Sequence, residues 1–250
     1  MPSFQTYNPN NLVKTLICGE SGSGKTGLLA TLAKAKFIDK IIILDFDNGL
    51  RILKSYLDEE QTKKIIFETL DPMDPKSAVT AASLAMQWKT KSEDLGHYTS
   101  WNAQTVFVVD SLTFAGNAFL ANAEAEMKAR RDPRMNHRQA IIGEAQQGLE
   151  KFVAHCFFRM PCHVIFNTHI KGTEEGGAMR NYPSTIGVAL SQKVGRYVND
   201  MWRIDVKPGD KRIIRTTADH NMTLKNSAPN VLKPEEDFNL EKIFATLMVT

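Results

Sequence analysis

Residues 19–26 of this 250-residue chain read Gly19-Glu20-Ser21-Gly22-Ser23-Gly24-Lys25-Thr26. The stretch matches the pattern G-x-x-x-x-G-K-[S/T] in full, follows an apolar run at residues 12–18 and precedes a helical pattern. Glycines let backbone N–H groups turn inward around phosphate oxygens, and the N-terminus of the following helix adds its positive dipole end. The sequence therefore predicts a phosphate-binding loop between a strand and a helix.

This loop predicts a site for ATP and Mg²⁺. Lys25 is expected to reach the β- and γ-phosphates, and the hydroxyl of Thr26 is expected to ligate Mg²⁺. The predicted nucleotide-binding residues are Gly19, Glu20, Ser21, Gly22, Ser23, Gly24, Lys25 and Thr26.

Apolar strand-like runs alternate with helical patterns along the rest of the chain, which favours an α/β fold with a mostly parallel central sheet and flanking helices. After the strand at 12–18, further strands are expected at residues 41–46, 63–68, 105–110 and 162–168, and helices at about 25–35, 77–88, 114–129 and 137–159. Residues 171–186 are polar and glycine-rich, and we expect a mobile loop there. Residues 197–206 and 212–217 are expected to form a C-terminal β-hairpin, and residues 238–247 a closing helix. A single domain over residues 1–250 is the simplest division.

Composition limits the class of protein. The apolar and charged fractions, 42% and 24%, are those of a globular chain, and the net charge of +3 permits a polyanionic partner without requiring one. The three cysteines form no disulfide or zinc pattern, which suits a reducing cytoplasm. The N-terminal residues 1–11 lack an apolar signal core, and no stretch has the length of a membrane span.

Carboxylates follow two of the predicted strands. Asp110 ends the run Val108-Val109-Asp110, where it is a candidate to hold Mg²⁺ through water. Asp45 and Asp47 end the strand at 41–46, near the expected γ-phosphate, and either one is a candidate to orient an attacking water. A turn of purely structural value at Asp47-Asn48-Gly49 is the alternative.

Together these motifs resemble the RecA-like P-loop ATPase core, and most of all the short phage recombination and single-strand annealing ATPases (the phage nucleotide-binding proteins). The resemblance covers roughly residues 12–226. It implies that Asp47 takes the position of a family glutamate, a shorter side chain that puts the hydrolysis rate in question more than nucleotide binding. It also implies that His169, at the end of the strand at 162–168, senses the γ-phosphate. Lys225 would reach the ATP of a neighbouring subunit, although a solvated surface lysine is the alternative.

Two segments are candidates for contact with single-stranded DNA. Basic residues gather at Arg130, Arg131 and Arg134, and Arg180 and Tyr182 lie in the segment 171–186. Phosphate contacts need such charge, and a tyrosine ring can stack on a base. Two glutamates in the same segment oppose this hypothesis.

The resemblance implies a DNA-stimulated ATPase that acts on single-stranded DNA in recombination or strand annealing, as a ring or filament. A single-strand binding protein is an expected partner, and the expected location is the cytoplasm of a phage-infected or prophage-bearing bacterial cell. A small-molecule kinase and a nucleotide-gated protein-binding module remain alternatives, because both use the same loop.

Overall fold

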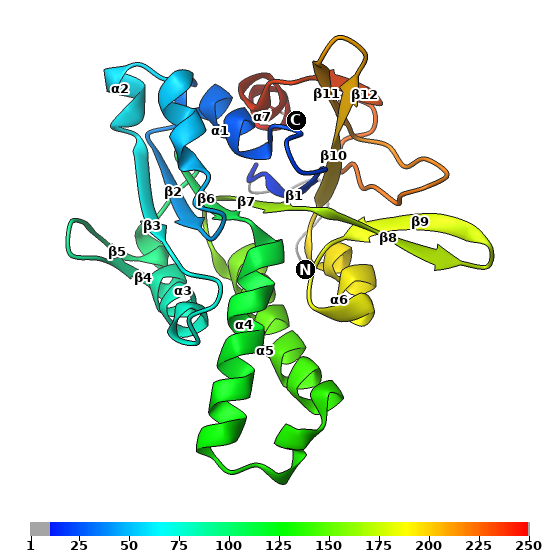
Figure 1. The fold of residues 1–250 in the computed structure, drawn as a ribbon. Coiled ribbons are helices and arrows are strands. Elements are labelled where there is room, and N and C mark those ends of the chain that lie inside the picture. The colour runs from blue at the N-terminus through cyan, green and yellow to red at the C-terminus, as the bar shows by residue number, and fades with distance from the viewer. Residues whose placement is uncertain (1–10, 250) are drawn as a thin grey trace, which may run out of the picture.

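The computed structural model describes residues 11–249, so most of the polar N-terminal segment lies outside the described residues. Its centre is an eight-stranded sheet in the order β12-β11-β10-β1-β7-β6-β2-β3 (Figure 1). The strands are β1 (Lys14–Cys18), β2 (Lys40–Asp45), β3 (Ile65–Thr69), β6 (Thr105–Asp110), β7 (His163–Thr168), β10 (Asp200–Lys207), β11 (Lys211–Arg215) and β12 (Glu235–Asp237). From β3 to β10 all neighbours pair parallel, whereas β10, β11 and β12 pair antiparallel. The predicted α/β fold with a mostly parallel sheet and a C-terminal hairpin is confirmed.

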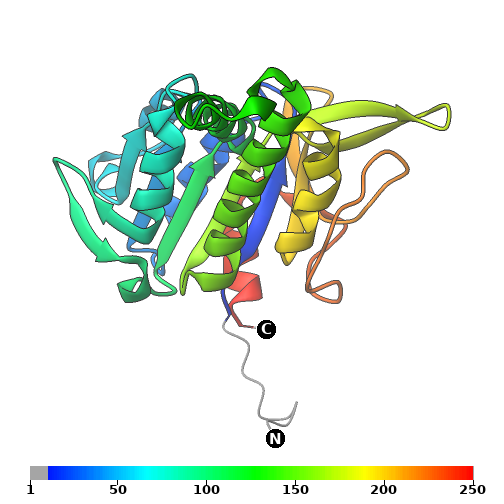
Figure 2. The same cartoon turned by 90° about the horizontal axis from the view of Figure 1, so that it is seen from below.

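Helices cover both faces of this sheet (Figures 1 and 2). One face carries α1 (Lys25–Ala33), the 3₁₀ helix η2 (Leu50–Ser55) and α7 (Leu240–Leu247). The other carries α3 (Lys76–Met86), α4 (Leu112–Ala129), α5 (Arg138–Arg159) and α6 (Gly187–Lys193). Side chains of β2 alternate between the two cores: Ile41 and Ile43 pack with α1 and α7, and Ile42 and Leu44 pack with the larger core opposite. A strand buried on both faces reads as a continuous apolar run, which is why the sequence revealed β1, β2, β6 and β7.

Shorter elements connect these layers. They are α2 (Glu59–Thr62), β4 (Gln87–Lys89), β5 (Asp94–His97) and the 3₁₀ turns η3 (Tyr98–Ser100), η4 (Pro133–Asn136) and η5 (Val194–Tyr197). Trp88, expected at the end of a helix, lies instead in β4 with its side chain buried. Residues 222–226 add no strand to the sheet and contribute an isolated bridge between Met201 and Lys225. No helix within residues 11–249 has the length and apolar character needed to cross a membrane.

The expectation of a loop at residues 171–186 is wrong. β8 (Ile170–Glu175) and β9 (Ala178–Pro183) form an antiparallel hairpin that projects from the sheet beside β10 (Figure 1). Gly176 and Gly177 form its turn with φ of +59° and +80°, a backbone region that glycine enters without strain. Most hairpin side chains are at least partly exposed, so the strands show no apolar periodicity, and only the Gly-Gly pair signalled a turn.

Candidate functional site

The predicted phosphate loop connects the carboxyl end of β1 to the N-terminus of α1. Gly22 and Gly24 have φ of +77° and +99°, values that side-chain-bearing residues rarely adopt. Gly24 is also the N-cap of α1, so the free N–H groups of the first helical turn face the loop. The backbone is thus shaped to surround an anion.

Lys25 lies over the mouth of this loop. Its Nζ donates hydrogen bonds to the backbone oxygens of Gly19 and Glu20, both at 3.0 Å, and lies 3.5 Å from Nδ1 of His169. Burial lowers the pKa of Lys25, while the carboxylates of Asp110 and Asp47 oppose that shift. A phosphate group would supply the negative charge that this partly desolvated ammonium lacks.

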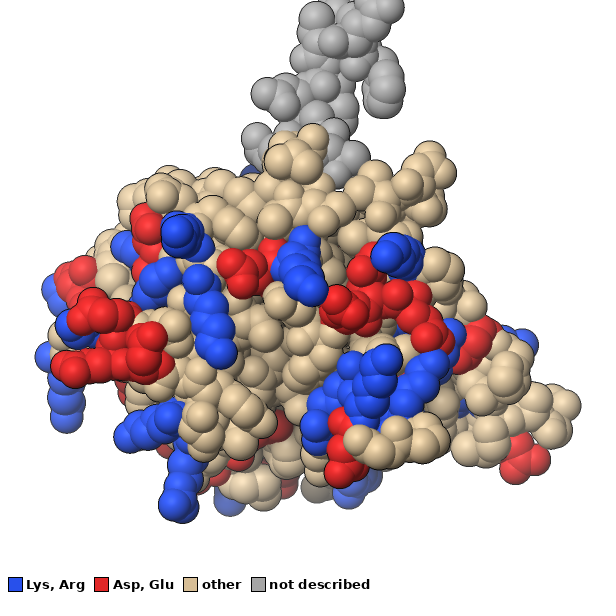
Figure 3. All heavy atoms as spheres, turned by 90° about the horizontal axis from the view of Figure 1, so that it is seen from above, with Lys and Arg blue, Asp and Glu red and all other residues tan. Residues whose placement is uncertain are grey.

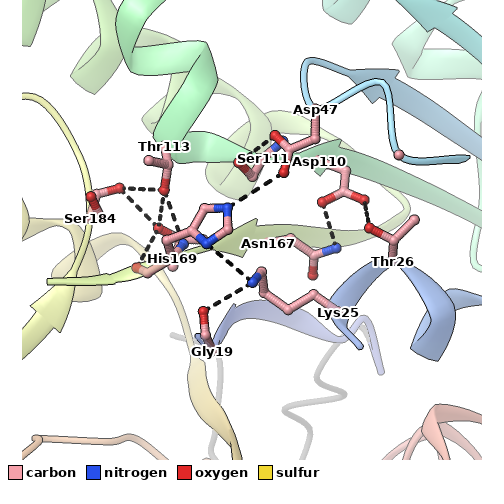
Figure 4. A network of polar contacts seen from close by, with 12 residues as sticks. Gly19, Lys25, Thr26, Asp47, Asp110, Ser111, Thr113, Asn167, His169 and Ser184 are labelled. Carbon is pink, nitrogen blue, oxygen red and sulfur yellow. Dashed lines mark hydrogen bonds and ion pairs between the residues drawn. The ribbon is translucent and has the colours of Figure 1, made fainter. Parts of the chain in front are cut away.

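The side-chain oxygens of Thr26 and Asp110, which could ligate a metal ion, lie together at the base of the loop (Figure 4). The Thr26 hydroxyl donates to Oδ2 of Asp110 at 2.6 Å, and Nδ2 of Asn167 donates to Oδ1 at 3.0 Å. Burial raises the pKa of Asp110 to about 6, although the bonds from Thr26 and Asn167 favour the carboxylate. A hydroxyl beside a buried carboxylate fits Mg²⁺, which prefers hard oxygen ligands and keeps several waters.

The two candidate bases have different surroundings. Oδ1 of Asp47 accepts from the backbone N–H and the hydroxyl of Ser111, at 3.0 and 2.7 Å, and Asp47 lines the cavity above the loop. Asp45 is 1% exposed, and its oxygens accept from Gly49 N–H and the Thr69 hydroxyl, both at 3.4 Å. β2 ends at Asp45, so the alternation of side chains along the strand does not extend to Asp47. Only Asp47 therefore faces the phosphate loop.

His169 connects the loop to the hairpin (Figure 4). Its Nε2 lies 3.6 Å from Oδ2 of Asp47, and its backbone N–H donates to the Thr113 hydroxyl at 3.0 Å. The backbone oxygen of His169 accepts from Ser184 N–H at 2.7 Å, directly after β9. One residue thus touches the two charged groups of the loop region, Lys25 and Asp47, and both ends of the hairpin.

A cavity of about 720 Å³ extends from the phosphate loop along α1. It includes residues that sequence reasoning missed: Ile52, Tyr56, Arg212 and Phe238. The Nε of Arg212 donates to the backbone oxygen of Ser23 at 3.1 Å. No local motif marks these residues. Ile52 and Tyr56 reach the cavity because η2 packs against α1, whereas Arg212 and Phe238 reach it through the order of the strands.

Lys225 does not line this cavity. Its Nζ donates to the backbone oxygens of Gly195, at 3.2 Å, and Val198. Its backbone pairs with Met201 at the edge of β10. In this chain the ammonium is thus held by neighbouring carbonyl groups of its own subunit.

The candidate DNA contacts fall on two projections (Figure 1). At the tip of the α4–α5 pair, Arg130 is bonded to Glu144, and Arg134 is bonded to Asp132 at 2.6 Å. Arg131 is exposed at the end of α4. On the hairpin, Arg180 is exposed, whereas the Tyr182 hydroxyl donates to Glu175 at 2.8 Å.

The face covered by α1 and α7 carries charges of both signs. Figure 3 shows lysine and arginine side chains interspersed with aspartate and glutamate over this face. Mixed signs are typical of a solvated surface rather than of a nucleic-acid track. Any polyanion site is therefore better sought at the projections.

A family comparison agrees with the nucleotide site. The family model described as "AAA domain" matches residues 11–228. The crystal structure of the RadB recombinase is similar with a TM-score of 0.49 and 19% identity, over 91% of this chain and 90% of that one. The type III secretion ATPase EscN, solved with its central stalk EscO from enteropathogenic E. coli, gives a TM-score of 0.48 and 13% identity over 86% of this chain. This chain spans 50% of the length of EscN. No curated protein matches.

Proposed function

This chain belongs to the AAA-domain family of P-loop ATPases, and we propose that single-stranded DNA controls its hydrolysis of ATP. The finer proposal, taken from the resemblance to phage recombination ATPases, is a role in recombination or strand annealing inside a phage-infected or prophage-bearing cell. In the same proposal the chain assembles into a ring or filament. It acts together with a single-strand binding protein.

In this proposal the phosphate loop and Lys25 bind the β- and γ-phosphates. Lys25 exchanges its bonds to the Gly19 and Glu20 carbonyls for bonds to phosphate oxygens, which carry more charge. Thr26 and Asp110 hold Mg²⁺, which when bound neutralises developing charge on the phosphates.

Asp47 is the proposed base. Ser111 fixes one oxygen of this carboxylate with two hydrogen bonds, and the other oxygen faces His169 and the cavity. A carboxylate held at one oxygen keeps a fixed direction at the other, as a group that orients a water molecule requires. Asp45 has no such access, because it is buried against β3.

One observation carries the DNA part of the proposal: His169 lies between the phosphate site and the hairpin. Its ring approaches Lys25 and Asp47, and its backbone accepts a bond from Ser184 at the end of β9. Lys171 and Arg180 lie exposed on that hairpin, where a DNA backbone can reach them. A DNA strand that binds the hairpin would thus act on His169, the residue that contacts both Lys25 and Asp47.

The two alternatives receive different support. A kinase would need a free arginine-bearing lid, but Arg130 and Arg134 are already bonded to Glu144 and Asp132. A nucleotide-gated protein-binding module is favoured by Met179, a large apolar side chain that is 58% exposed on the same hairpin. The experiment must therefore separate DNA from a protein as the hairpin's partner.

The test is ATP hydrolysis with and without single-stranded DNA, beside the Lys25→Ala variant. We expect DNA to raise the rate, Lys25→Ala to abolish it, and the double variant Lys171→Ala/Arg180→Ala to remove the stimulation while the basal rate stays. Arg131→Ala, at the other projection, is the matched control. A measurable rate that DNA leaves unchanged would overturn the DNA role, and loss of stimulation in Arg131→Ala alone would move the contact to the helix tip.

A further inference from the structure

The phosphate loop is approached by a cation from a distant part of the chain. Arg212 lies in β11, which reaches the loop because β11 pairs with β10 and β10 pairs with β1. Along β11, Ile214 is buried in the core with α1 and α7, so Arg212, two residues earlier, emerges on the same face of the sheet. Lys211 precedes Arg212 in β11, so the alternation of side chains along a strand directs it to the opposite face.

The approach of Arg212 is close. Its Nε donates to the Ser23 carbonyl, and a Cβ added at Gly24 would lie 3.1 Å from Nε and 3.2 Å from Cδ of Arg212. The same added Cβ would lie 3.0 Å from Cζ of Phe238. Gly24 thus provides the space that Arg212 occupies, in addition to the φ of +99° that the loop requires.

The guanidinium has no carboxylate partner in the described part of the chain. Two other arginines of the β10–β11 pair do have a carboxylate partner: Arg203 and Arg215 both pair with Asp205, at 2.6 and 2.7 Å. Within residues 11–249, Arg212 makes one hydrogen bond, through Nε, and it lines the 720 Å³ cavity. Its terminal nitrogens therefore keep their charge and their donors for a ligand in that cavity.

We propose that Arg212 is a nucleotide-binding residue that contacts the phosphates of the bound nucleotide from within the same subunit. This inference rests on the proposed function of the loop. Arg212 comes from β11 and Asp47 follows β2, and these strands lie on opposite sides of β1 in the sheet, so the contact serves binding rather than bond cleavage. ATP and ADP both gain from it, and a neighbouring subunit is not needed to supply this charge.

The decisive variant is Arg212→Gln. The amide nitrogen of glutamine occupies the position of Nε, so the bond to Ser23 can persist while the charge is lost. We expect the dissociation constants for ATP and ADP, measured by fluorescence of a labelled nucleotide, to rise roughly 10- to 100-fold. The KM for ATP should rise in parallel with kcat nearly unchanged. Arg212→Lys should retain part of the affinity, and Lys211→Ala should bind as the unsubstituted chain does.

Three outcomes would overturn the inference. Equal binding by Arg212→Gln and the unsubstituted chain would show that Arg212 only supports the loop through Ser23. A fall in kcat at constant KM would assign Arg212 to the transition state instead of to binding. A lower melting temperature of nucleotide-free Arg212→Gln, with affinity loss matched by Arg212→Lys, would indicate a structural role. Failure of the unsubstituted chain to bind ATP would instead reject the proposed function itself.

Discussion

Nε2 of His169 lies 3.6 Å from Oδ2 of Asp47, so the ends of β7 and β2 meet at one point beside the phosphate loop. The other oxygen of Asp47 is fixed by Ser111, which follows β6. Asp47, Ser111 and His169 thus follow three parallel strands, β2, β6 and β7. Carboxyl ends of parallel strands are where α/β sheets bind ligands, because the connecting loops converge there.

The first prediction separates the two aspartates. Asp47→Asn should lower kcat by about 100-fold or more, because an amide cannot accept a proton from water, while nucleotide affinity changes little. Asp45→Asn should hydrolyse ATP at close to the original rate, since Asp45 contacts Gly49 and Thr69 rather than the cavity. Steady-state kinetics with binding measured separately checks both. The reverse pattern would make Asp45 the base.

His169→Gln tests the connection to the hairpin. Glutamine keeps a polar side chain but lacks the ring that contacts Lys25 and Asp47 together. We expect the DNA stimulation to fall about tenfold, a coupling of ordinary size, with DNA affinity and basal hydrolysis far less affected. Measuring the rate against DNA concentration separates coupling from binding. Full stimulation in this variant would remove His169 from the proposal.

Lys225→Ala addresses the predicted contact with a neighbouring subunit. Because the ammonium is bonded to the Gly195 and Val198 carbonyls, its loss should lower the free energy of unfolding by about 1–3 kcal/mol and leave the rate per folded molecule intact. Denaturant titration and kinetics check this. If Lys225→Ala is inactive and regains activity when mixed with Lys25→Ala, the lysine instead acts across a subunit interface.

The stability should depend on pH through His163. This side chain is fully buried, and burial lowers its pKa from 6.5 to about 4, while its Nδ1 accepts from Val13 N–H at 2.9 Å. Between these values the unfolded chain binds a proton that the folded chain does not. The contribution of His163 to the free energy of unfolding is therefore full above pH 6.5. It falls by about 1.4 kcal/mol per pH unit as the pH is lowered toward 4.

His163→Asn keeps an acceptor for Val13 without titrating in this range. Urea denaturation at several pH values gives the free energy of unfolding as a function of pH. Between pH 4 and 6.5 this free energy should change less steeply with pH for the variant than for the unsubstituted chain. The variant's lower overall stability, from the space left by the smaller side chain, does not affect this comparison of slopes. Equal slopes would show that other groups account for the acid sensitivity.

Local patterns explain what could be predicted. β6 was predicted with its full extent at residues 105–110, because a strand buried on both faces is apolar throughout. The phosphate loop is predictable because the glycines, the lysine and the threonine that bind phosphate and Mg²⁺ lie within eight consecutive residues, 19–26. The hairpin at β8 and β9 was missed because neither strand has a consistently buried face, and periodicity is the signal on which such predictions depend.

Local sequence patterns predict the α/β class, the phosphate loop and the group of carboxylates at strand ends, because each depends on residues close together in the chain. Which of these side chains meet depends on the tertiary structure. It turned Asp47 toward the loop and Asp45 toward β3, it bonded Lys225 to its own subunit, and it brought Arg212 to Ser23. Strand order and register set these distances, and both result from packing of the whole sheet rather than from any local pattern.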